Sequence, residues 1–277
     1  MFNEMLVSAG VMGGLGIIFA AGLAWAAGKF SVDSDPKVEL LASLLPGANC
    51  GSCGCSGCAG YAEALVAGTV SVDACRVVDS QAKEEICSIL GVEASQQGKR
   101  QVAKIRCRGD YRLARWVARY EGVQDCRAAS MVGSSPKGCS EGCLGLGTCT
   151  TVCPFGAITL GEDHLPVVDE EKCTGCGACA AACPRQVIAI MDYDVPVIVR
   201  CNSHGKGRPV RENCQVGCLG CRACVKVCEQ HAISMVHNLA VIDLTKCTGC
   251  GACAAKCPSG CIELQTLEAR REEIFPA

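Results

Sequence analysis

The sequence has few aromatic residues and few histidines. Aromatic residues make up 4% of the 277 positions, and there are four histidines. A large aromatic core is therefore not expected. Small metal-binding lobes do not need one, because metal binding contributes folding free energy that apolar burial would otherwise supply. With so few histidines, zinc sites of mixed cysteine and histidine ligation are disfavoured.

Common catalytic signatures are missing as well. We find no G-x-G-x-x-G after a predicted strand, no Walker A loop, no Ser/His/Asp arrangement and no paired carboxylates. No substrate site is therefore expected in this chain, and nothing in it indicates a nucleic-acid partner. The formal net charge of −2 says little about partners by itself.

Cysteine is abundant, with 27 copies. Disulfide scaffolds are usually short, and an odd number of cysteines leaves one thiol unpaired. Zinc ribbons place C-x2-C pairs on either side of a loop, whereas these cysteines form tight triplets followed by a fourth. The pattern favours [4Fe–4S] clusters, with zinc as the alternative, in a reducing compartment where free thiolates persist.

An uncharged stretch, Met5–Ala27, lies near the start of the chain. A helix of that length crosses a hydrocarbon core of ~30 Å. A cleaved signal peptide is disfavoured, because the only charged residue ahead of the stretch is Glu4 and the apolar run is long. Lys29 and Lys37 follow the helix, so the positive-inside rule predicts a single-pass anchor in the cell membrane, with the cluster domains on the cytoplasmic side.

A Gly-rich segment, LPGANCGSCGCSGCAGYAEAL, follows a predicted helix at 38–45. Glycine lets backbone amides approach and hydrogen-bond cluster sulfides. We expect a helix over 59–67 to fold back so that a fourth cysteine closes the site. Cys55 lies in the turn between ligands, although spacing alone does not exclude it, and Cys87 is expected to be a buried core thiol. The predicted ligands of this first cluster are Cys50, Cys53, Cys58 and Cys75.

The C-terminal half contains an internal repeat, which outweighs any single motif match. VVDEEKCTGCGACAAACP recurs as VIDLTKCTGCGACAAKCP. Cys173, Cys176, Cys179 and Cys183 recur 74 positions later as Cys247, Cys250, Cys253 and Cys257. Upstream, Cys139, Cys143, Cys149 and Cys153 recur 75 positions later as Cys214, Cys218, Cys224 and Cys228.

The runs C-x2-C-x2-C-x3-C-P match bacterial two-cluster ferredoxins, in which the fourth cysteine ligates the other cluster. In the first unit the predicted sets are Cys139, Cys143, Cys149 and Cys183, and then Cys173, Cys176, Cys179 and Cys153. In the second unit they are Cys218, Cys221, Cys224 and Cys257, and then Cys247, Cys250, Cys253 and Cys228. Leu146 stands where the second unit has Cys221, so the first set includes Cys139 instead. With the lobe, at least five clusters are expected.

Several cysteines remain outside these sets, Cys261 among them. Cys107 and Cys201 each end an alternating, strand-like segment ahead of their unit, QVAKIRC and VPVIVRC. Buried structural cysteines are the commoner explanation. The alternative hypothesis is a sixth cluster held by Cys107, Cys126, Cys201 and Cys214.

A basic stretch precedes the repeat. Its arginines at helical spacing, opposite an apolar face, predict an amphipathic helix. An ordinary solvated face is one interpretation. The functional ones are contact with anionic lipid headgroups and steering of an acidic ferredoxin to its docking site. The candidate partner-binding residues are Arg108, Arg112, Arg115 and Arg119.

The predicted fold class is α+β, with a transmembrane helix, a small helical [4Fe–4S] lobe and two tandem two-cluster ferredoxin-like units. The expected division is an anchor at 1–30, the lobe at 31–92, a basic amphipathic connector at 93–135, the first unit at 136–195, the second at 196–265 and a polar tail at 266–277.

On these residues the chain resembles RnfB, the B subunit of the Rnf ion-translocating ferredoxin:NAD oxidoreductase. The resemblance rests on the uncharged N-terminal helix, the LPGANCGSCGCSGCAGYAEA lobe and the ferredoxin-like tail, and it covers essentially the whole chain. It implies a membrane subunit that receives electrons from reduced ferredoxin and passes them to other subunits of the complex, which hold flavins and reduce NAD. A redox-sensing module and an electron-transfer subunit of another reductase are the alternatives.

Overall fold

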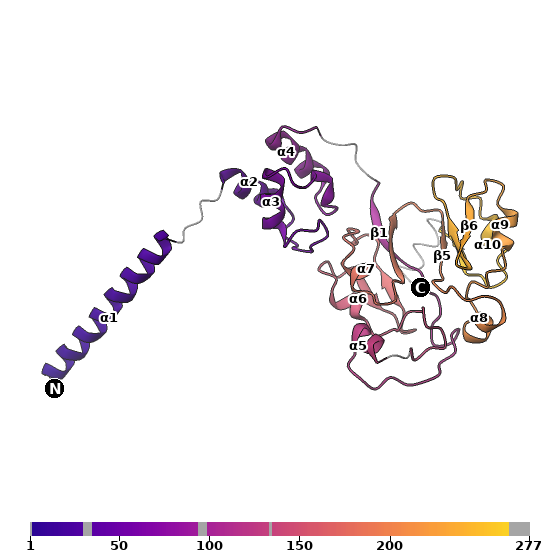
Figure 1. The fold of residues 1–277 in the computed structure, drawn as a ribbon, viewed down its shortest axis with the longest axis horizontal. Helices are drawn as coiled ribbons and strands as arrows, with labels where there is room; N and C mark the ends of the chain where they lie inside the picture. The colour runs from indigo at the N-terminus through magenta and orange to yellow at the C-terminus, as the bar shows by residue number, and fades with distance from the viewer. Residues whose placement is uncertain (1, 30–34, 94–98, 133–134, 266–277) are drawn as a thin grey trace.

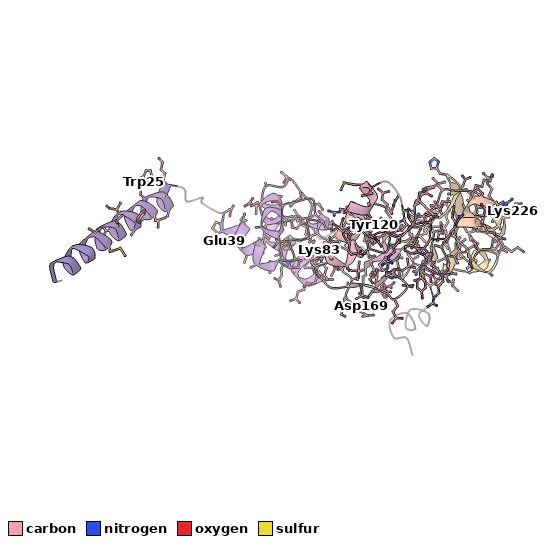
Figure 2. The ribbon with its side chains drawn as sticks, turned by 90° about the horizontal axis from the view of Figure 1, so that it is seen from below. Trp25, Glu39, Lys83, Tyr120, Asp169 and Lys226 are labelled. Atoms are coloured by element: carbon pink, nitrogen blue, oxygen red, sulfur yellow. The ribbon has the colours of Figure 1, made fainter. Side chains whose placement is uncertain are left out.

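The structure, a computed structural model, describes residues 2–29, 35–93, 99–132 and 135–265. Its first element is helix α1 (Phe2–Lys29), which Figure 1 shows apart from the other helices and strands. Within α1, Gly10–Lys29 is long and apolar enough to cross a membrane, and it is not buried against the rest of the chain. Trp25, labelled in Figure 2, is 70% exposed. The helix predicted over Met5–Ala27 is confirmed.

Three α-helices and one 3-10 turn form the next lobe. They are α2 (Pro36–Leu44), α3 (Cys58–Val66), η1 (Val72–Ala74) and α4 (Ser80–Leu90). Asp35 and Asp79 cap α2 and α4 by accepting backbone N–H bonds. Leu41, Tyr61 and Ile86, one from each α-helix, are almost fully buried and form the centre of its core. The helices expected at 38–45 and 59–67 are therefore present.

The remaining elements follow one order twice. Unit one contains β1 (Gln101–Ile105), α5 (Cys126–Met131), α6 (Thr148–Thr151), β2 (Ile158–Leu160), β3 (Pro166–Val168), α7 (Ala178–Ala182) and β4 (Ile188–Asp192). Unit two contains β5 (Val197–Val199), α8 (Arg208–Asn213), α9 (Ala223–Val227), β6 (Ile233–Val236), β7 (Leu239–Ile242), α10 (Ala252–Ala255) and β8 (Ile262–Leu264).

Each unit has two antiparallel strand pairs, and the pairing is the same in both. The first strand pairs with the last, β1 with β4 and β5 with β8. The two middle strands form a hairpin, β2 with β3 and β6 with β7. The two cores contain apolar strand residues packed with buried cysteines, and Figure 1 shows the two units beside each other.

Strand β1 begins unit one earlier than the sequence indicated. It falls in the segment expected to be a connector, yet its register joins Gln101 to Asp192 and Ile105 to Ile188 of β4. Four of its five residues are buried, including Lys104, which pairs with Glu170. The polar tail expected at 266–277 lies outside the described residues.

The prediction of an amphipathic helix around Arg108–Arg119 is wrong. This segment contains a short turn and isolated bridges instead, with Ala114 paired to Cys214 and Trp116 to Lys137. The backbone N–H of Arg115 donates to the carbonyl of Asn213 at 2.8 Å. These contacts satisfy backbone groups that a helix would have bonded internally, so tertiary pairing overrides the helical periodicity.

Candidate metal centres

The lobe gathers its predicted ligands around one Gly-rich loop. Cys58 begins α3, and its backbone N–H donates to Oδ1 of Asn49 at 2.8 Å. Cys75 follows η1, which the Tyr61 hydroxyl ties to α3 by donating to the carbonyls of Ser71 and Val72. Burial raises the pKa of Cys75, and the nearby charges of Cys53 and Cys50 raise it further.

Two further lobe cysteines have other environments. Cys55 lies beside Cys53 and shares a side-chain hydrogen bond with it. Cys87 is on α4 and is 4% exposed, so the prediction of a buried core thiol is confirmed.

The structure brings together three of the four cysteines predicted for the first site of unit one. Cys126, Cys143, Cys149 and Cys183 line one narrow cavity, and Cys139 is not among its lining residues. Burial raises the pKa of Cys149 to about 11, and the charges of Cys126 and Cys183 add to the effect. Cys126, at the start of α5, is therefore the fourth cysteine that lines this cavity.

Local hydrogen bonds position Cys126. Its backbone N–H donates to Oγ1 of Thr148 at 2.6 Å, and the Thr148 hydroxyl donates to Asp125 at 2.9 Å. Asp125 also caps α5 by accepting the N–H of Ala128. Because Thr148 begins α6, which carries Cys149, these bonds hold the two helices together. Sequence spacing alone does not show this contact, since Cys126 and Thr148 are 22 positions apart.

The four cysteines predicted for the second site of unit one lie together in the structure. Cys153, Cys173, Cys176 and Cys179 line a common cavity. The Sγ of Cys173 accepts the backbone N–H of Ala103 at 3.4 Å. Burial raises the pKa of Cys179 to about 12, and the charges of Cys173 and Cys176 add to it. Without iron the Cys179 thiol stays protonated at neutral pH, so cluster binding must displace its proton.

Unit two places Cys224 near Cys218, Cys221 and Cys257, and Cys253 near Cys247 and Cys250. Burial raises the pKa of Cys224 to about 11, with added effects from Cys218, Cys221 and Cys257. Burial also raises the pKa of Cys253, near Cys247 and Cys250. Cys228 comes directly after α9. Its repeat equivalent, Cys153, likewise lies just beyond the end of α6.

Cys261 lies against the first of these groups. Its thiol is 3.6 Å from Sγ of Cys257 and also bonds Cys218. These hydrogen bonds lower the pKa of Cys257 to about 4 and that of Cys218 to about 6. The equivalent position in unit one, 74 residues earlier, is Val187. Unit two therefore has a hydrogen-bonding thiol where unit one has an apolar side chain.

The remaining cysteines lie between the units. Cys107, Cys139, Cys201 and Cys214 line one cavity. The sequence-based grouping of spare cysteines had Cys126 in place of Cys139. The signal that distinguishes the two was the 75-residue offset, which makes Cys139 the equivalent of Cys214 and gives both the same role.

The four candidate partner-binding arginines do not share one face. The Arg108 guanidinium donates to the carbonyl of Gly260 at 3.1 Å, so it joins the two units. Arg112 lies over the ring of Tyr111. Arg115 and Arg119 are exposed, and Arg119 pairs with Glu121.

The cysteine groups have the features that iron–sulfur clusters require. Among the described residues, no three His, Cys, Asp or Glu side chains converge closely enough to hold one metal ion. Zinc would draw its sulfurs to ≈ 2.3 Å from one centre, whereas a four-iron cluster spreads its thiolates around a larger body. The glycine-rich loops and the backbone N–H bonds to sulfur match what such clusters require.

Three family models match the chain. Residues 45–77 match the model "Putative Fe-S cluster", residues 166–189 match "4Fe-4S binding domain", and residues 217–261 match "4Fe-4S dicluster domain". These matches fall on the lobe, on the second site of unit one and on unit two. They show iron–sulfur domains in all three parts.

Whole-chain relatives are also found. The chain is 45% identical to the B subunit of the Na+-translocating ferredoxin:NAD+ oxidoreductase complex of Acetobacterium woodii, over 95% of this chain and 78% of that protein. It is 44% identical to the B subunit of the ion-translocating oxidoreductase complex of Methanosarcina acetivorans, over 96% of this chain and 100% of the relative. The B subunit of a proton-translocating ferredoxin:NAD+ oxidoreductase complex from Clostridium ljungdahlii is 42% identical over 94% of this chain and 93% of its own length.

Proposed function

The chain belongs to the family of B subunits of ion-translocating (Rnf) oxidoreductase complexes, and from this premise we propose that it carries electrons from reduced ferredoxin toward the subunits of the complex that reduce NAD+. It is an electron-transfer subunit with ferredoxin-type [4Fe–4S] domains. The names of two relatives supply the proposed electron donor and acceptor.

The proposal assigns five clusters to five cysteine groups. When bound, each [4Fe–4S] cluster accepts and donates one electron. The chain holds the clusters, buries them and donates backbone N–H bonds to their sulfurs. The ligand sets are Cys50, Cys53, Cys58 and Cys75 in the lobe; Cys126, Cys143, Cys149 and Cys183, and Cys153, Cys173, Cys176 and Cys179 in unit one; and Cys218, Cys221, Cys224 and Cys257, and Cys228, Cys247, Cys250 and Cys253 in unit two.

The observation that carries the proposal is the succession of these groups. Burial raises the pKa of Cys176, and the charges of Cys50 in the lobe and of Cys153 add to it, so the lobe site lies near unit one. Cys149 and Cys179, from the two sites of unit one, are also close enough for their charges to interact. A redox sensor needs one labile cluster, whereas a relay needs neighbouring ones.

We place the cluster domains on the cytoplasmic side in this proposal. Lys29 lies in the last turn of α1 and Lys37 in α2, and the positive-inside rule sets such residues on the cytoplasmic side. Protease added to intact cells should leave the domains uncut. Cleavage between α1 and the lobe under those conditions would reverse this topology.

Electron transfer can be tested in inverted membrane vesicles that contain the whole complex. NADH formation driven by reduced ferredoxin should fall by roughly tenfold or more in Cys176→Ala, because one member of the series is removed. Cys87→Ala, which removes a buried thiol outside all five groups, is the matched control and should keep the parental rate. A parental rate in Cys176→Ala, after iron analysis shows the cluster is lost, would contradict the relay.

A further inference from the structure

Two of the 27 cysteines are exposed, and both lie in unit two. They are Cys221 and Cys250, each the middle cysteine of its run. The position of unit one that is equivalent to Cys250 is Cys176, which lies near Cys50 of the lobe. A donor outside the chain comes closest to a cluster where a ligand is exposed, and electron transfer slows steeply with distance. Cys221 and Cys250 are therefore the contact points that the structure offers to such a donor.

The run around Cys221 has charges that the other cysteine runs lack. It reads LGCRACVK at 219–226, whereas the runs at 174–181 and 248–255 both read TGCGACAA. The remaining run, at 144–151, reads LGLGTCTT. Of these four segments, the one that contains Cys221 is alone in having charged residues, Arg222 and Lys226. The repeat therefore separates the surroundings of Cys221 from those of Cys250.

Arg222 adopts a backbone conformation that favours glycine. Its φ is +62°, in the left-handed region, at the residue before α9. The equivalent residues are Gly147, Gly177 and Gly251, with φ values of +78°, +85° and +74°. Glycine adopts this conformation freely, whereas a Cβ makes it costly. Such outliers persist where the side chain has a function, so this one points to a role for the Arg222 guanidinium.

Two lysines lie beside Arg222. The backbone N–H of Lys226 donates to the carbonyl of Arg222 at 3.2 Å, so the two residues are one helical turn apart. Lys206 comes from the loop before α8, and a Cβ added at Gly220 would lie 3.5 Å from its Cγ. Because Gly220 directly precedes Cys221, all three cations lie around the exposed cysteine. We call Lys206, Arg222 and Lys226 the cationic patch.

The cationic patch is exposed, and its charges are not compensated within the part of the chain that the structure describes. Its three side chains are exposed. Arg208, two positions after Lys206, pairs with Glu212, but the patch residues form no ion pair with any described residue. Figure 2 labels Lys226 at the opposite end of the molecule from Trp25 of α1. The patch is therefore open to a partner that approaches from the side away from α1.

We infer that the cationic patch is the docking site of the electron donor, a soluble protein with an acidic face, and that electrons enter this chain at the Cys218 site. The inference rests on the proposed function and adds the surface and the entry site. Uncompensated cations attract an acidic partner and orient it on the surface. One electron leaves the reduced donor and reduces the Cys218 site by one electron, and no bond forms or breaks. Transient electron-transfer complexes bury small interfaces, so three charges are a large part of one.

The first test is binding of the oxidised donor to the full-length chain with its clusters, isolated without oxygen. The probe is a two-cluster ferredoxin of strongly negative net charge, and isothermal titration calorimetry measures its affinity. Arg222→Gly with Lys226→Ala, the patch variant, copies the runs at 174–181 and 248–255 and should bind about tenfold more weakly at low ionic strength. Stopped-flow reduction by the reduced ferredoxin should slow by a similar factor. At about 1 M salt, where the Debye length is ~3 Å, variant and parent should converge.

Two control variants separate the charge of the patch from other effects. Lys99→Ala with Lys172→Ala removes two lysines of unit one, 70% and 65% exposed, and should keep the parental affinity and rate. Arg222→Lys with Lys226→Arg preserves both charges and should do the same.

Two measurements on the patch variant exclude a structural defect. Reduced methyl viologen, a small cation, should reduce the patch variant as fast as the parent. The thermal midpoint of the patch variant should be no lower than that of the parent, because glycine fits the backbone at position 222.

The outcomes separate this inference from the proposed function. Parental affinity and rate in the patch variant at low salt would overturn the inference and leave the proposed function intact. Equal slowing with ferredoxin and with methyl viologen would also overturn it, because the defect would then lie in the site itself. A changed oligomeric state, or loss of a neighbouring subunit from the assembled complex, would assign the patch to a second copy or to that subunit instead. A parent that reduced ferredoxin does not reduce would overturn the proposed function, and the inference with it.

Discussion

Units one and two share strand pairing and cysteine offsets, yet they complete one site differently. In unit two the three ligands that we propose from the first run are close in sequence, and Cys221 is the middle one. In unit one that position is Leu146, and the structure brings Cys126 from α5 into the group instead. A cluster needs a thiolate at the right position in the folded structure, and any position in the sequence can supply it. A ligand can therefore change its sequence position while the site persists.

A second difference concerns the surroundings of the same two sites. Cys261 contacts Cys218 and Cys257 in unit two, whereas unit one has Val187. A thiol donor near ligand sulfurs stabilises the more negative, reduced state of a cluster. Two sites with the same ligand type can thus differ in reduction potential.

Removing all iron should have the largest effect, and it should affect both units alike. Their cores consist of short strands packed with ligand cysteines, so metal binding supplies much of their folding free energy. We expect chelation to abolish cooperative unfolding of both units, measured by circular dichroism, while α1 keeps its helix in detergent. Cooperative thermal unfolding of the iron-free units would show that the cores suffice.

Replacing Cys126 should damage one site in unit one. Cys126→Ala should lose about four irons, or leave a three-iron cluster, as Cys221→Ala should in unit two. The sharper test is rescue, because Leu146 occupies the repeat position of Cys221. Cys126→Ala combined with Leu146→Cys should recover the iron count and the EPR signal, since the thiolate is restored at the repeat position. An undamaged spectrum in Cys126→Ala alone would exclude Cys126 as a ligand.

Replacing Cys261 should shift the reduction potential of one cluster, the one proposed at the Cys218 site, without loss of iron. Cys261→Val, which copies unit one, should lower the reduction potential of the Cys218 site by roughly 50 mV, a hydrogen bond of about 1 kcal/mol expressed for one electron. Redox titration followed by EPR would measure it. Val187→Cys is the reciprocal variant and should raise the potential of the Cys143 site. A loss of iron in Cys261→Val would instead make Cys261 a ligand.

The smallest effect should come from the exposed arginines. Arg112, Arg115 and Arg119 do not form the expected helical face but remain exposed. If they steer an acidic ferredoxin, changing all three to Glu should slow ferredoxin-driven reduction a few-fold at low salt. Reduction by dithionite should be unchanged. Equal ferredoxin rates in variant and parent at low ionic strength would exclude this surface as the dock.

The sequence predicted most local elements because their signals are local. The uncharged stretch of α1, the Asp-capped helices of the lobe and the repeated cysteine runs required no knowledge of distant contacts. The helix expected at Arg108–Arg119 failed because Asn213 and Pro136, far along the chain, accept its backbone N–H groups. The spacing of apolar and basic residues carries no information about hydrogen-bond partners that lie elsewhere in the chain.

The same limit explains why the sequence did not place Cys126 beside Cys143, Cys149 and Cys183. Spacing suggested Cys139 for the first site of unit one, because Cys139 is near Cys143 in sequence. The hydrogen bond from Cys126 to Thr148, which brings α5 to that site, has no sequence signature. The repeat does contain a signal that separates Cys139 from Cys126. Cys139 and Cys214 have the same offset as the other equivalent cysteines, whereas Cys126 has no such equivalent.

Cys139 and Cys214 line one cavity and Cys126 lines another, and we propose that the first two serve one site while Cys126 serves a different one. EPR and iron analysis of two double variants test it directly. Cys139→Ala with Cys214→Ala should lose one cluster, about four irons, without a three-iron signal, because one site lacks two ligands. Cys126→Ala with Cys214→Ala should damage two clusters, because each of two sites lacks one ligand. The reverse pattern, with one cluster affected in the second pair and two in the first, would contradict the account.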